Sequence, residues 1–471
     1  MGPGQRGRKN THVDRAQCHS IRVCSGLRHH LAEHRAIAAR LGAAMIVDVL
    51  VFFGLPLTLL ILGAPIYAAI FASGLTALLL VPNAPIHAVQ SVLFGSLNNF
   101  SLLAIPLFVL AGDLMAQGGL AKRLVSWALA GVGGVRGSLP LAAVASATTF
   151  GAMSGSASAC LAAVGRIMYP DLRKAGYSEG YSGALLASTA VIGAVIPPSI
   201  PMIIYGVVAQ QSIPDLFLAG VLPGLLIALV IGVYVWMKAR HEKQNVLATG
   251  ERPSFLRETK EASWSLAAPV VILGGIYGGI FTPTEAAGVA VIYSMLVSRY
   301  IYKELTWRDM WRITSESMYL VGRLIVIFAA AGLYAWALTV SGLAQKLGTT
   351  VTEWQLATWQ LLLIFNVLML IVGAFLDPPP ALLILTPVFF PIFQAAGVDP
   401  IHLGLIMVVN LSMGMFTPPI GVNLFIANVL FKIDIGVLYR SVLPFVALYV
   451  AILMILTYVP EITLFALHAF K

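Results

Sequence analysis

The chain contains two halves of similar sequence, and this internal repeat constrains the fold more than any other feature. Glycines and prolines of the first half return in the second half at a displacement of 221 residues: Gly193 as Gly414, Pro197 and Pro198 as Pro418 and Pro419, and Pro223 as Pro444. Each proline pair interrupts a long apolar run. In membrane proteins, interrupted hydrophobic segments at corresponding positions of two halves are the best sequence indication of a transport site. The repeat therefore predicts a transporter.

The composition places the chain in a membrane. Hydrophobic residues make up 59% of the sequence and charged residues only 10%, whereas a soluble domain carries about 25% charged residues. Many apolar stretches approach the ~20 residues that a helix needs to cross a bilayer. We therefore expect an all-α polytopic membrane protein with about ten crossings, each built from such a stretch. This pattern excludes a soluble fold.

Residues 1–44 do not belong to the apolar pattern. The stretch is rich in Lys and Arg and poor in acids. It contains no apolar segment of the kind that follows the charges of a signal peptide. We expect a disordered basic tail, or an upstream extension with the working start at Met45. Nucleic-acid binding is not expected, because the rest of the chain is only weakly basic.

The distribution of basic residues predicts that the two halves have opposite orientations. No Lys or Arg lies between Lys346 and Lys432, whereas the corresponding part of the first half contains several. Cytoplasmic loops accumulate positive charge, so two similar segments with opposite charge distribution indicate an inverted-topology repeat.

The predicted organisation has two repeats and a linker. The first repeat covers 45–237, with a re-entrant helical hairpin at about 137–168 and a broken transmembrane helix at about 181–209. A cytoplasmic linker covers 238–264. The second repeat covers 265–471, with a re-entrant hairpin at about 354–395 and a broken helix at about 402–430.

The tips of the two hairpins carry the residues that could do chemistry. The first tip offers the hydroxyls of Ser154, Ser156 and Ser158, which are neutral oxygen ligands, although small residues also serve for helix packing in membranes. The second tip reads Asp377 followed by three prolines. Because prolines cannot continue a helix, backbone groups are freed there, and such backbone is tolerated at membrane depth only inside protein or beside water. Asp377 is equally compatible with a helix cap and a ligand.

The proline pairs predict binding sites of a second kind. A helix broken midway exposes carbonyl groups at one half-helix end and N–H groups at the other. Carbonyl ends suit Na⁺, and N-terminal ends suit an anionic group of a substrate. We interpret the two breaks, together with the two tips, as one binding region.

Three further charged residues lie in or near apolar segments. Glu285 follows Thr282 and a proline, which indicates a helix cap. Asp113 and Arg323 are expected either to pair with each other or to face a polar rim.

These motifs resemble the large membrane subunit of the tripartite ATP-independent periplasmic (TRAP) transporters. The resemblance covers Met45 to about Phe470. It is carried by five motifs: Met153-Ser-Gly-Ser-Ala-Ser-Ala159, Gly193-Ala-Val-Ile-Pro-Pro-Ser199, Phe281-Thr-Pro-Thr-Glu-Ala-Ala287, Asp377-Pro-Pro-Pro-Ala381 with Leu385-Thr-Pro387, and Phe416-Thr-Pro-Pro-Ile-Gly-Val422. Residues 1–44 have no counterpart in the family pattern.

The resemblance implies a function that the residues alone do not show. Members of the family are sodium-driven importers of organic acids such as dicarboxylates, 2-oxo acids or sialic acid, and they lie in the bacterial inner membrane. A periplasmic binding protein delivers the substrate, and a small four-helix membrane subunit braces the large one. The hairpins and broken helices are expected to move by an elevator-type mechanism. Na⁺ is the coupling ion, and no other metal or cofactor is expected.

The resemblance also implies roles for particular residues. The expected sodium ligands are Ser154, Ser156, Gly193, Ile196, Gly373, Gly414 and Thr417. The expected substrate-binding residues are Ser156, Ser158, Ser199, Asp377, Thr417 and Asn423.

Three alternatives remain open at this stage. The nearest is a sodium-coupled anion carrier that works as a single polypeptide without a binding protein. The others are a channel and a membrane-embedded enzyme. An enzyme would need clustered metal ligands, or a nucleophile beside a base. The sequence shows neither pattern.

Overall fold

The computed structural model describes residues 46–81, 84–241, 254–353 and 356–470, and within these ranges every regular element is a helix. The expected tail at 1–44 and the middle of the expected linker lie outside the described residues. The first half contains α2(Leu55–Ile61), α3(Ile66–Leu80), α4(Val89–Leu97), α5(Ala104–Gln117), α6(Leu120–Val132), α7(Ser138–Ser154), α8(Ala157–Lys174), α9(Glu179–Ala190), α10(Ile192–Val195), α11(Ile200–Val208) and α12(Ile213–His241). The second half contains α13(Phe255–Glu261), α14(Ser263–Tyr277), α15(Pro283–Leu296), α16(Trp307–Ser341), α17(Leu343–Glu353), α18(Thr358–Phe375), α19(Pro378–Ala395), α20(Pro400–Gly414), α21(Val422–Phe431), α22(Ile435–Tyr458) and α23(Pro460–Phe470).

Six of the described helices are long and apolar enough to cross a membrane, and a seventh span results if the bent pair Glu179–Val195 and Ile200–Val208 is counted as one. These six are Phe100–Gln117, Ile213–Arg240, Trp307–Ser341, Thr358–Phe375, Pro378–Ala395 and Ile435–Tyr458. The chain is therefore an all-helical, multi-pass protein, as the composition predicts. The ten crossings stay a prediction, as does the opposite orientation of the halves.

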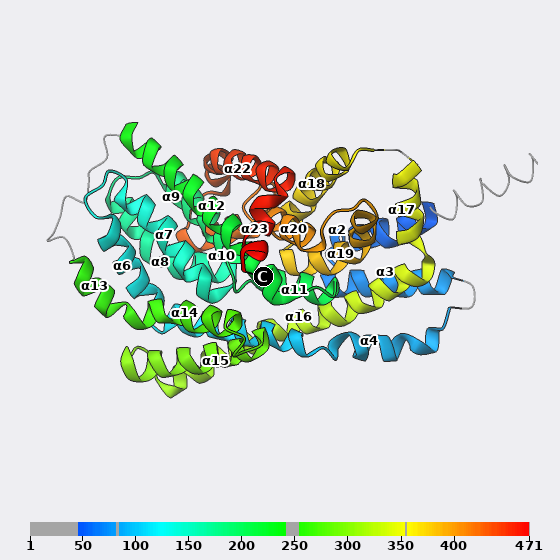
Figure 1. The fold of residues 1–471 in the computed structure, drawn as a ribbon, viewed down its shortest axis with the longest axis horizontal. Coiled ribbons are helices and arrows are strands. Elements are labelled where there is room, and N and C mark those ends of the chain that lie inside the picture. Colours follow the sequence, from blue (N-terminus) through cyan, green and yellow to red (C-terminus); the bar gives the residue numbers. More distant parts are fainter. Residues whose placement is uncertain (1–45, 82–83, 242–253, 354–355, 471) are drawn as a thin grey trace, which may run out of the picture.

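Helices lie at the positions expected for two hairpins and two broken helices, and the re-entrant course of the hairpins stays a prediction. Helices α7 and α8 form the first hairpin, which ends at Lys174 and is longer than expected. Helices α9, α10 and α11 form the first broken helix, bent by 43° at the break. Helices α18 and α19 correspond to the second hairpin, and α20 and α21 to the second broken helix. Figure 1 shows α7–α10 on the left and α18–α20 on the right.

The boundary of the linker differs from the expected one. Helix α12 continues to His241, and α13 begins at Phe255, so both ends of the expected 238–264 linker are helical. Two cations stabilise the end of α12 by lying over aromatic rings, as Lys238 lies 4.2 Å from the ring centre of Tyr181 and Arg240 lies 3.6 Å from that of Trp236. These contacts give the charged residues at the end of α12 a place to pack, so the helix continues beyond its apolar part.

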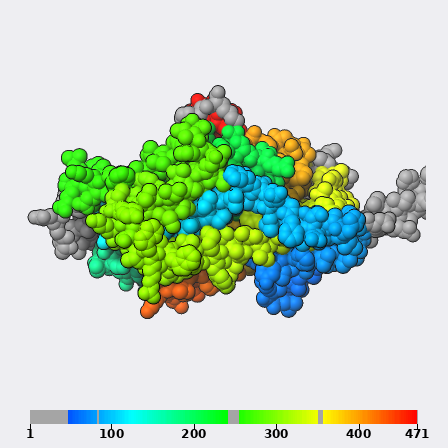
Figure 2. All heavy atoms as spheres, turned by 90° about the horizontal axis from the view of Figure 1, so that it is seen from below, coloured from blue at the N-terminus to red at the C-terminus, as the bar shows by residue number. Residues whose placement is uncertain are grey.

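The long helix α16 packs against helices of both halves of the chain. In Figure 1 it runs below α11 and α19, and it contacts α3, α4, α5 and α19. Figure 2 shows the molecule from below. The segments coloured blue and yellow-green, which include α4, α15 and α16, cover the face seen in this view.

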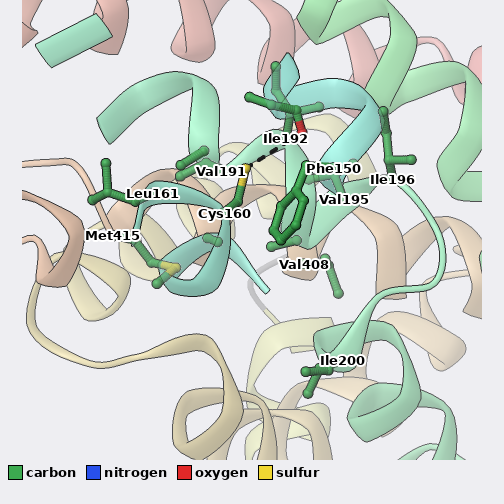
Figure 3. Close-up of a cluster of buried hydrophobic side chains, with 14 of the residues drawn as sticks. Phe150, Cys160, Leu161, Val191, Ile192, Val195, Ile196, Ile200, Val408 and Met415 are labelled. Carbon is green, nitrogen blue, oxygen red and sulfur yellow. Dashed lines mark hydrogen bonds between the residues drawn. The ribbon is translucent and has the colours of Figure 1, made fainter. Parts of the chain in front are cut away.

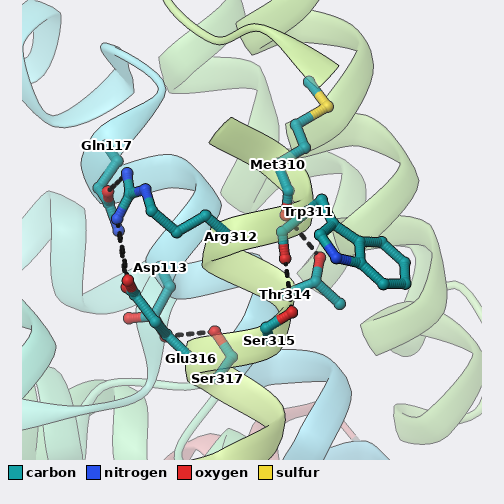
Figure 4. A network of polar contacts seen from close by, with 9 residues as sticks. All are labelled: Asp113, Gln117, Met310, Trp311, Arg312, Thr314, Ser315, Glu316 and Ser317. Atoms are coloured by element: carbon teal, nitrogen blue, oxygen red, sulfur yellow. Dashed lines mark hydrogen bonds and ion pairs between the residues drawn. The ribbon is translucent and has the colours of Figure 1, made fainter. Parts of the chain in front are cut away.

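Polar contacts fix α16 to α5 (Figure 4). The Ser317 hydroxyl donates to Asp113 Oδ2 at 2.6 Å, and Arg312 Nη2 donates to Gln117 Oε1 at 3.0 Å. The expected pair of Asp113 and Arg323 does not form. Arg323 instead donates to the Tyr319 hydroxyl on its own helix, one turn away, where a partner is available at no cost in loop closure.

Each hairpin touches its broken helix through a pair of glycines. A Cβ atom built on Gly151 of α7 would lie 2.5 Å from Gly193 Cα of α10. A Cβ atom on Gly414 of α20 would lie 2.2 Å from the carbonyl carbon of Gly373 in α18. Small residues of this kind let backbones approach closely in membrane proteins. Both proline pairs, at 197–198 and 418–419, have cis peptide bonds.

We expect Gly151→Ala and Gly414→Ala to lower the thermal stability of the purified protein. Each added methyl group would meet backbone atoms at 2.2–2.5 Å, and overpacking of this kind costs about 1–3 kcal/mol. Gly288→Ala is the matched control, because a Cβ atom on this helical glycine meets nothing within 4 Å. Melting in detergent measures the difference, and equal melting temperatures for all three variants would contradict the proposed contacts.

Candidate functional site

The first hairpin tip is formed by the end of α7 and the start of α8. Gly155 ends α7 in a left-handed conformation, with φ at 64°. Ser156 then caps α8, since its hydroxyl accepts from the N–H of Ala159 at 3.4 Å and lies 3.2 Å from the Ser158 hydroxyl. Ser154, the last residue of α7, is fully buried, and its hydroxyl has no hydrogen-bond partner.

The tip rests directly on the first break. The N–H of Ile200 donates to the carbonyl of Gly155 at 3.2 Å. A Cβ atom on Gly193 would lie 3.5 Å from the carbonyl oxygen of Ser156. Ser199 caps α11 by accepting from the N–H of Met202 at 3.3 Å, and its hydroxyl donates to Ala194 O at 2.5 Å. The break is therefore held by backbone contacts from the tip.

Buried apolar side chains pack the first hairpin against its broken helix (Figure 3). Phe150 and Cys160 of the hairpin lie against Ile192 and Val195 of the broken helix, and all four are buried. The Cys160 thiol donates to the carbonyl of Ala147 at 3.6 Å, so it takes part in packing the hairpin.

The second tip also accepts a backbone N–H from its break, but through a carbonyl inside α18 rather than the one that follows α7, and its chemistry is different. The N–H of Gly421 donates to the carbonyl of Ala374 at 3.1 Å, and Gly421 is the residue equivalent to Ile200 at a displacement of 221. Asp377 occupies the position before α19, but its side chain makes no capping hydrogen bond. Its Oδ1 atom is buried without a partner. Three prolines follow, so the first turn of α19 offers no N–H donors.

The two tips meet at one cavity of about 140 Å³. Its polar side chains are Ser156 and Ser158 on one side and Asp377 on the other. Among the described residues that line it there is no Lys, Arg or His. The cavity therefore places hydroxyl donors opposite a carboxylate in otherwise apolar surroundings.

The remaining residues predicted to bind substrate do not line this cavity: Ser199, Thr417 and Asn423. The Thr417 hydroxyl donates to the carbonyl of Met413 at 2.9 Å. Asn423 is fully buried and donates to the carbonyl of Ala187 at 3.3 Å, which joins α21 to α9. Both side chains donate to a backbone carbonyl in this conformation, whereas Asn423 Oδ1 is buried without a partner.

The residues expected to bind sodium fall into two groups. Gly193 lies beside Ser156, and Ile196 follows α10 at the break. Gly373 touches Gly414, one turn before Thr417. Their role as ligands stays a prediction. Within the described ranges there is no group of three His, Cys, Asp or Glu that could hold another metal ion.

The sequence did not indicate the apolar wall of the cavity. Val109 of α5 and Leu320 and Leu324 of α16 line it together with Met415. These residues carry no distinguishing signal, because apolar side chains on membrane helices have the same composition whether they face lipid or a site.

The predicted cap at Glu285 is confirmed, since Glu285 and Thr282 form reciprocal capping bonds.

Comparisons with known proteins agree on one family. The family described as the tripartite ATP-independent periplasmic transporter, DctM component, matches residues 53–462. The chain is 39% identical over 393 residues to the C4-dicarboxylate TRAP transporter large permease protein DctM of Pseudomonas aeruginosa, covering 83% of this chain and 92% of that protein. It is 34% identical over 411 residues to the sialic acid TRAP transporter large permease protein SiaM of Vibrio cholerae, covering 87% and 96%.

Two further similarities extend this result. The isethionate TRAP transporter permease protein DctMQ of Oleidesulfovibrio alaskensis is 38% identical over 435 residues, covering 91% of this chain and 68% of that protein. Among solved structures, the YdaH transporter of Alcanivorax borkumensis has a similar fold, with a TM-score of 0.59 at 15% identity, covering 80% of this chain and 89% of that chain.

These relatives are named as transporter permeases, which identifies the chain as a transporter rather than an enzyme. The chain belongs to the family of large permease subunits, the DctM components, of the tripartite ATP-independent periplasmic transporters, and it is a multi-pass protein of the inner membrane.

Proposed function

We propose that the chain imports a small organic acid together with Na⁺, and that a periplasmic binding protein delivers the acid. The carboxylate and sialic acid named for the relatives support an acidic substrate. The cavity of about 140 Å³ favours a short acid, such as a dicarboxylate or a 2-oxo acid, over a bulky sugar acid.

The charge of the cavity is the observation that carries the proposal. Ser156 and Ser158, at the start of α8, offer hydroxyl donors and the positive end of a helix dipole to a carboxylate. Opposite them stands Asp377, and no basic side chain lines the cavity. An acid entering here would meet a second negative charge in apolar surroundings, where repulsion is strong. A bound cation removes this repulsion, and this gives a physical reason for coupling to Na⁺.

The shape of the cavity supports an elevator-type movement. Its polar residues come from the two hairpin tips, whereas Val109, Leu320 and Leu324 come from α5 and α16. A wall of apolar side chains makes no directional bonds with the tips. The hairpins and broken helices can therefore move along α5 and α16 without breaking hydrogen bonds at this surface.

The proposal includes two protein partners. The family is tripartite by description, so a small membrane subunit and a periplasmic binding protein are expected. The relative named DctMQ supports the first, since this chain covers only 68% of that longer permease.

We expect uptake in proteoliposomes to require an inward sodium gradient and the binding protein together. The chain would be reconstituted with its small subunit, and a radiolabelled C4-dicarboxylate supplied with or without the binding protein. A pH gradient without sodium is the control and should give no uptake.

Two outcomes of this experiment would overturn parts of the proposal. Uptake driven by the pH gradient alone would contradict sodium coupling. Sodium-driven uptake by this chain without the binding protein would favour a carrier that works as a single polypeptide.

We expect Asp377→Asn to weaken the dependence of uptake on sodium at least ten-fold, because the acid no longer meets a second negative charge that a cation must neutralise. The substitution removes the charge that a coupling cation would neutralise, and a hydrogen bond or contact to a charged group is worth about 1.5–3 kcal/mol. Ser158→Ala should raise the KM for the acid while leaving the sodium dependence unchanged. Both are measured as initial uptake rates at varied sodium and acid.

Glu285→Gln is the control for these variants. Glu285 is a carboxylate that caps an exposed helix end away from the cavity. Its loss should leave uptake per folded transporter unchanged. An Asp377→Asn variant with wild-type sodium dependence would exclude Asp377 from the coupling site.

A further inference from the structure

An apolar groove lies between α6, α7 and α12, on the side of the first hairpin away from the substrate cavity. Its volume is about 520 Å³. Trp127 of α6, Leu141 and Val144 of α7, and Leu229 and Trp236 of α12 are among its lining residues. The groove is a separate feature, because it shares no residue with the cavity between the hairpin tips.

The only hydroxyls in the lining are turned back into their own helix. Thr148 donates to the carbonyl of Val144 at 2.8 Å, and Thr149 donates to the carbonyl of Ala145 at 2.6 Å. Both side chains therefore have their donors satisfied within α7. The groove has a surface suited to a hydrocarbon chain and offers no polar recognition along its length.

Two arginines belong to the backbone segments that meet near one end of this groove. A Cβ atom on Gly137 would lie 2.6 Å from Ala239 Cβ, so the loop before α7 touches the end of α12. This contact brings Arg136 and Arg240 to the same end, since each is adjacent in sequence to one of the touching residues. The guanidinium of Arg240 lies 3.6 Å from the ring centre of Trp236, which lines the groove.

Neither arginine has a carboxylate partner in the part of the chain that the structure describes. The ion pairs found there involve other cations. Both side chains are exposed. Two exposed guanidinium groups near the same end of the groove, neither paired with an acid of the described residues, offer a place for an anion there. The positive-inside rule predicts that this end faces the cytoplasm.

We propose that the groove binds an anionic phospholipid, with one acyl chain against Leu141, Val144 and Leu229 and the phosphodiester at Arg136 and Arg240. Basic pockets between membrane helices on the cytoplasmic side bind anionic headgroups, and Trp236 is an aromatic residue of the type that sits at headgroup level. The apolar lining of the groove would be left empty by a soluble phosphate, and the two arginines near its end would be left without a partner by an uncharged protein helix. A phospholipid satisfies both features.

Native mass spectrometry of the full chain, alone and with its small membrane subunit, tests this assignment. The delipidated protein would be titrated with phosphatidylglycerol, and in parallel with phosphatidylcholine or glycerol 1-phosphate. We expect saturable binding of phosphatidylglycerol only. The double substitution Arg136→Gln with Arg240→Gln should weaken this binding about ten-fold or more, since each basic residue near an anionic surface contributes measurably.

Three further variants test whether lipid binding depends on the positive charge, on the open space of the groove, or on the loss of any exposed arginine. Arg136→Lys with Arg240→Lys keeps the charge and should keep most of the binding. Gly232→Leu should reduce binding by filling the groove, because Gly232 lines it and a Cβ atom there lies 3.9 Å from its nearest neighbour, Leu141 Cδ2. Arg440→Gln removes an exposed arginine elsewhere and should bind as wild type.

Several results would overturn the proposal. Equal binding of phosphatidylcholine would remove the role of the arginines, and displacement of the lipid by glycerol 1-phosphate would indicate a soluble phosphate site. Unchanged binding by the double Gln variant would place the lipid elsewhere. Loss of all binding when the small subunit is present would show that the subunit, and not a lipid, occupies the groove.

Discussion

The close approach of glycine backbones between each hairpin and its broken helix is the contact on which the rest of the structure depends. Gly151 against Gly193, and Gly373 against Gly414, leave no room for a side chain. In each half, a carbonyl of the hairpin also accepts a backbone N–H from the break. Irregular backbone at membrane depth must have its polar groups satisfied inside the protein. These contacts satisfy part of that requirement in both halves.

The two halves use this shared framework for opposite chemistry. The first tip ends in serine hydroxyls at the start of a helix, whereas the second ends in Asp377 followed by prolines that cannot donate. A symmetric repeat would have given two equal binding surfaces. The difference instead creates a cavity with a donor side and an acceptor side, and with an unbalanced negative charge. We propose that this imbalance is the reason for coupling to a cation, because the anion alone would be repelled.

Much of the framework could be predicted from the sequence, because glycine and proline act through the backbone at their own positions. The two breaks and the two tips were visible for this reason, and Glu285 was visible as a cap because Thr282 lies three residues before it. The apolar wall from Leu320 and Leu324 was not visible, since its role depends on which helix packs against the tips. The local partner of Arg323 was missed although Tyr319 lies only four residues before it. A charged residue in a membrane helix does not indicate which of several neighbours it will reach.

An experimental structure of the complex in sodium with a bound C4-dicarboxylate would test the central claim most directly. The account predicts the acid between the two hairpin tips, with one carboxylate at Ser156 and Ser158 and a cation between the acid and Asp377. An acid bound elsewhere, or one that contacts Asp377 with no cation near that carboxylate, would contradict it.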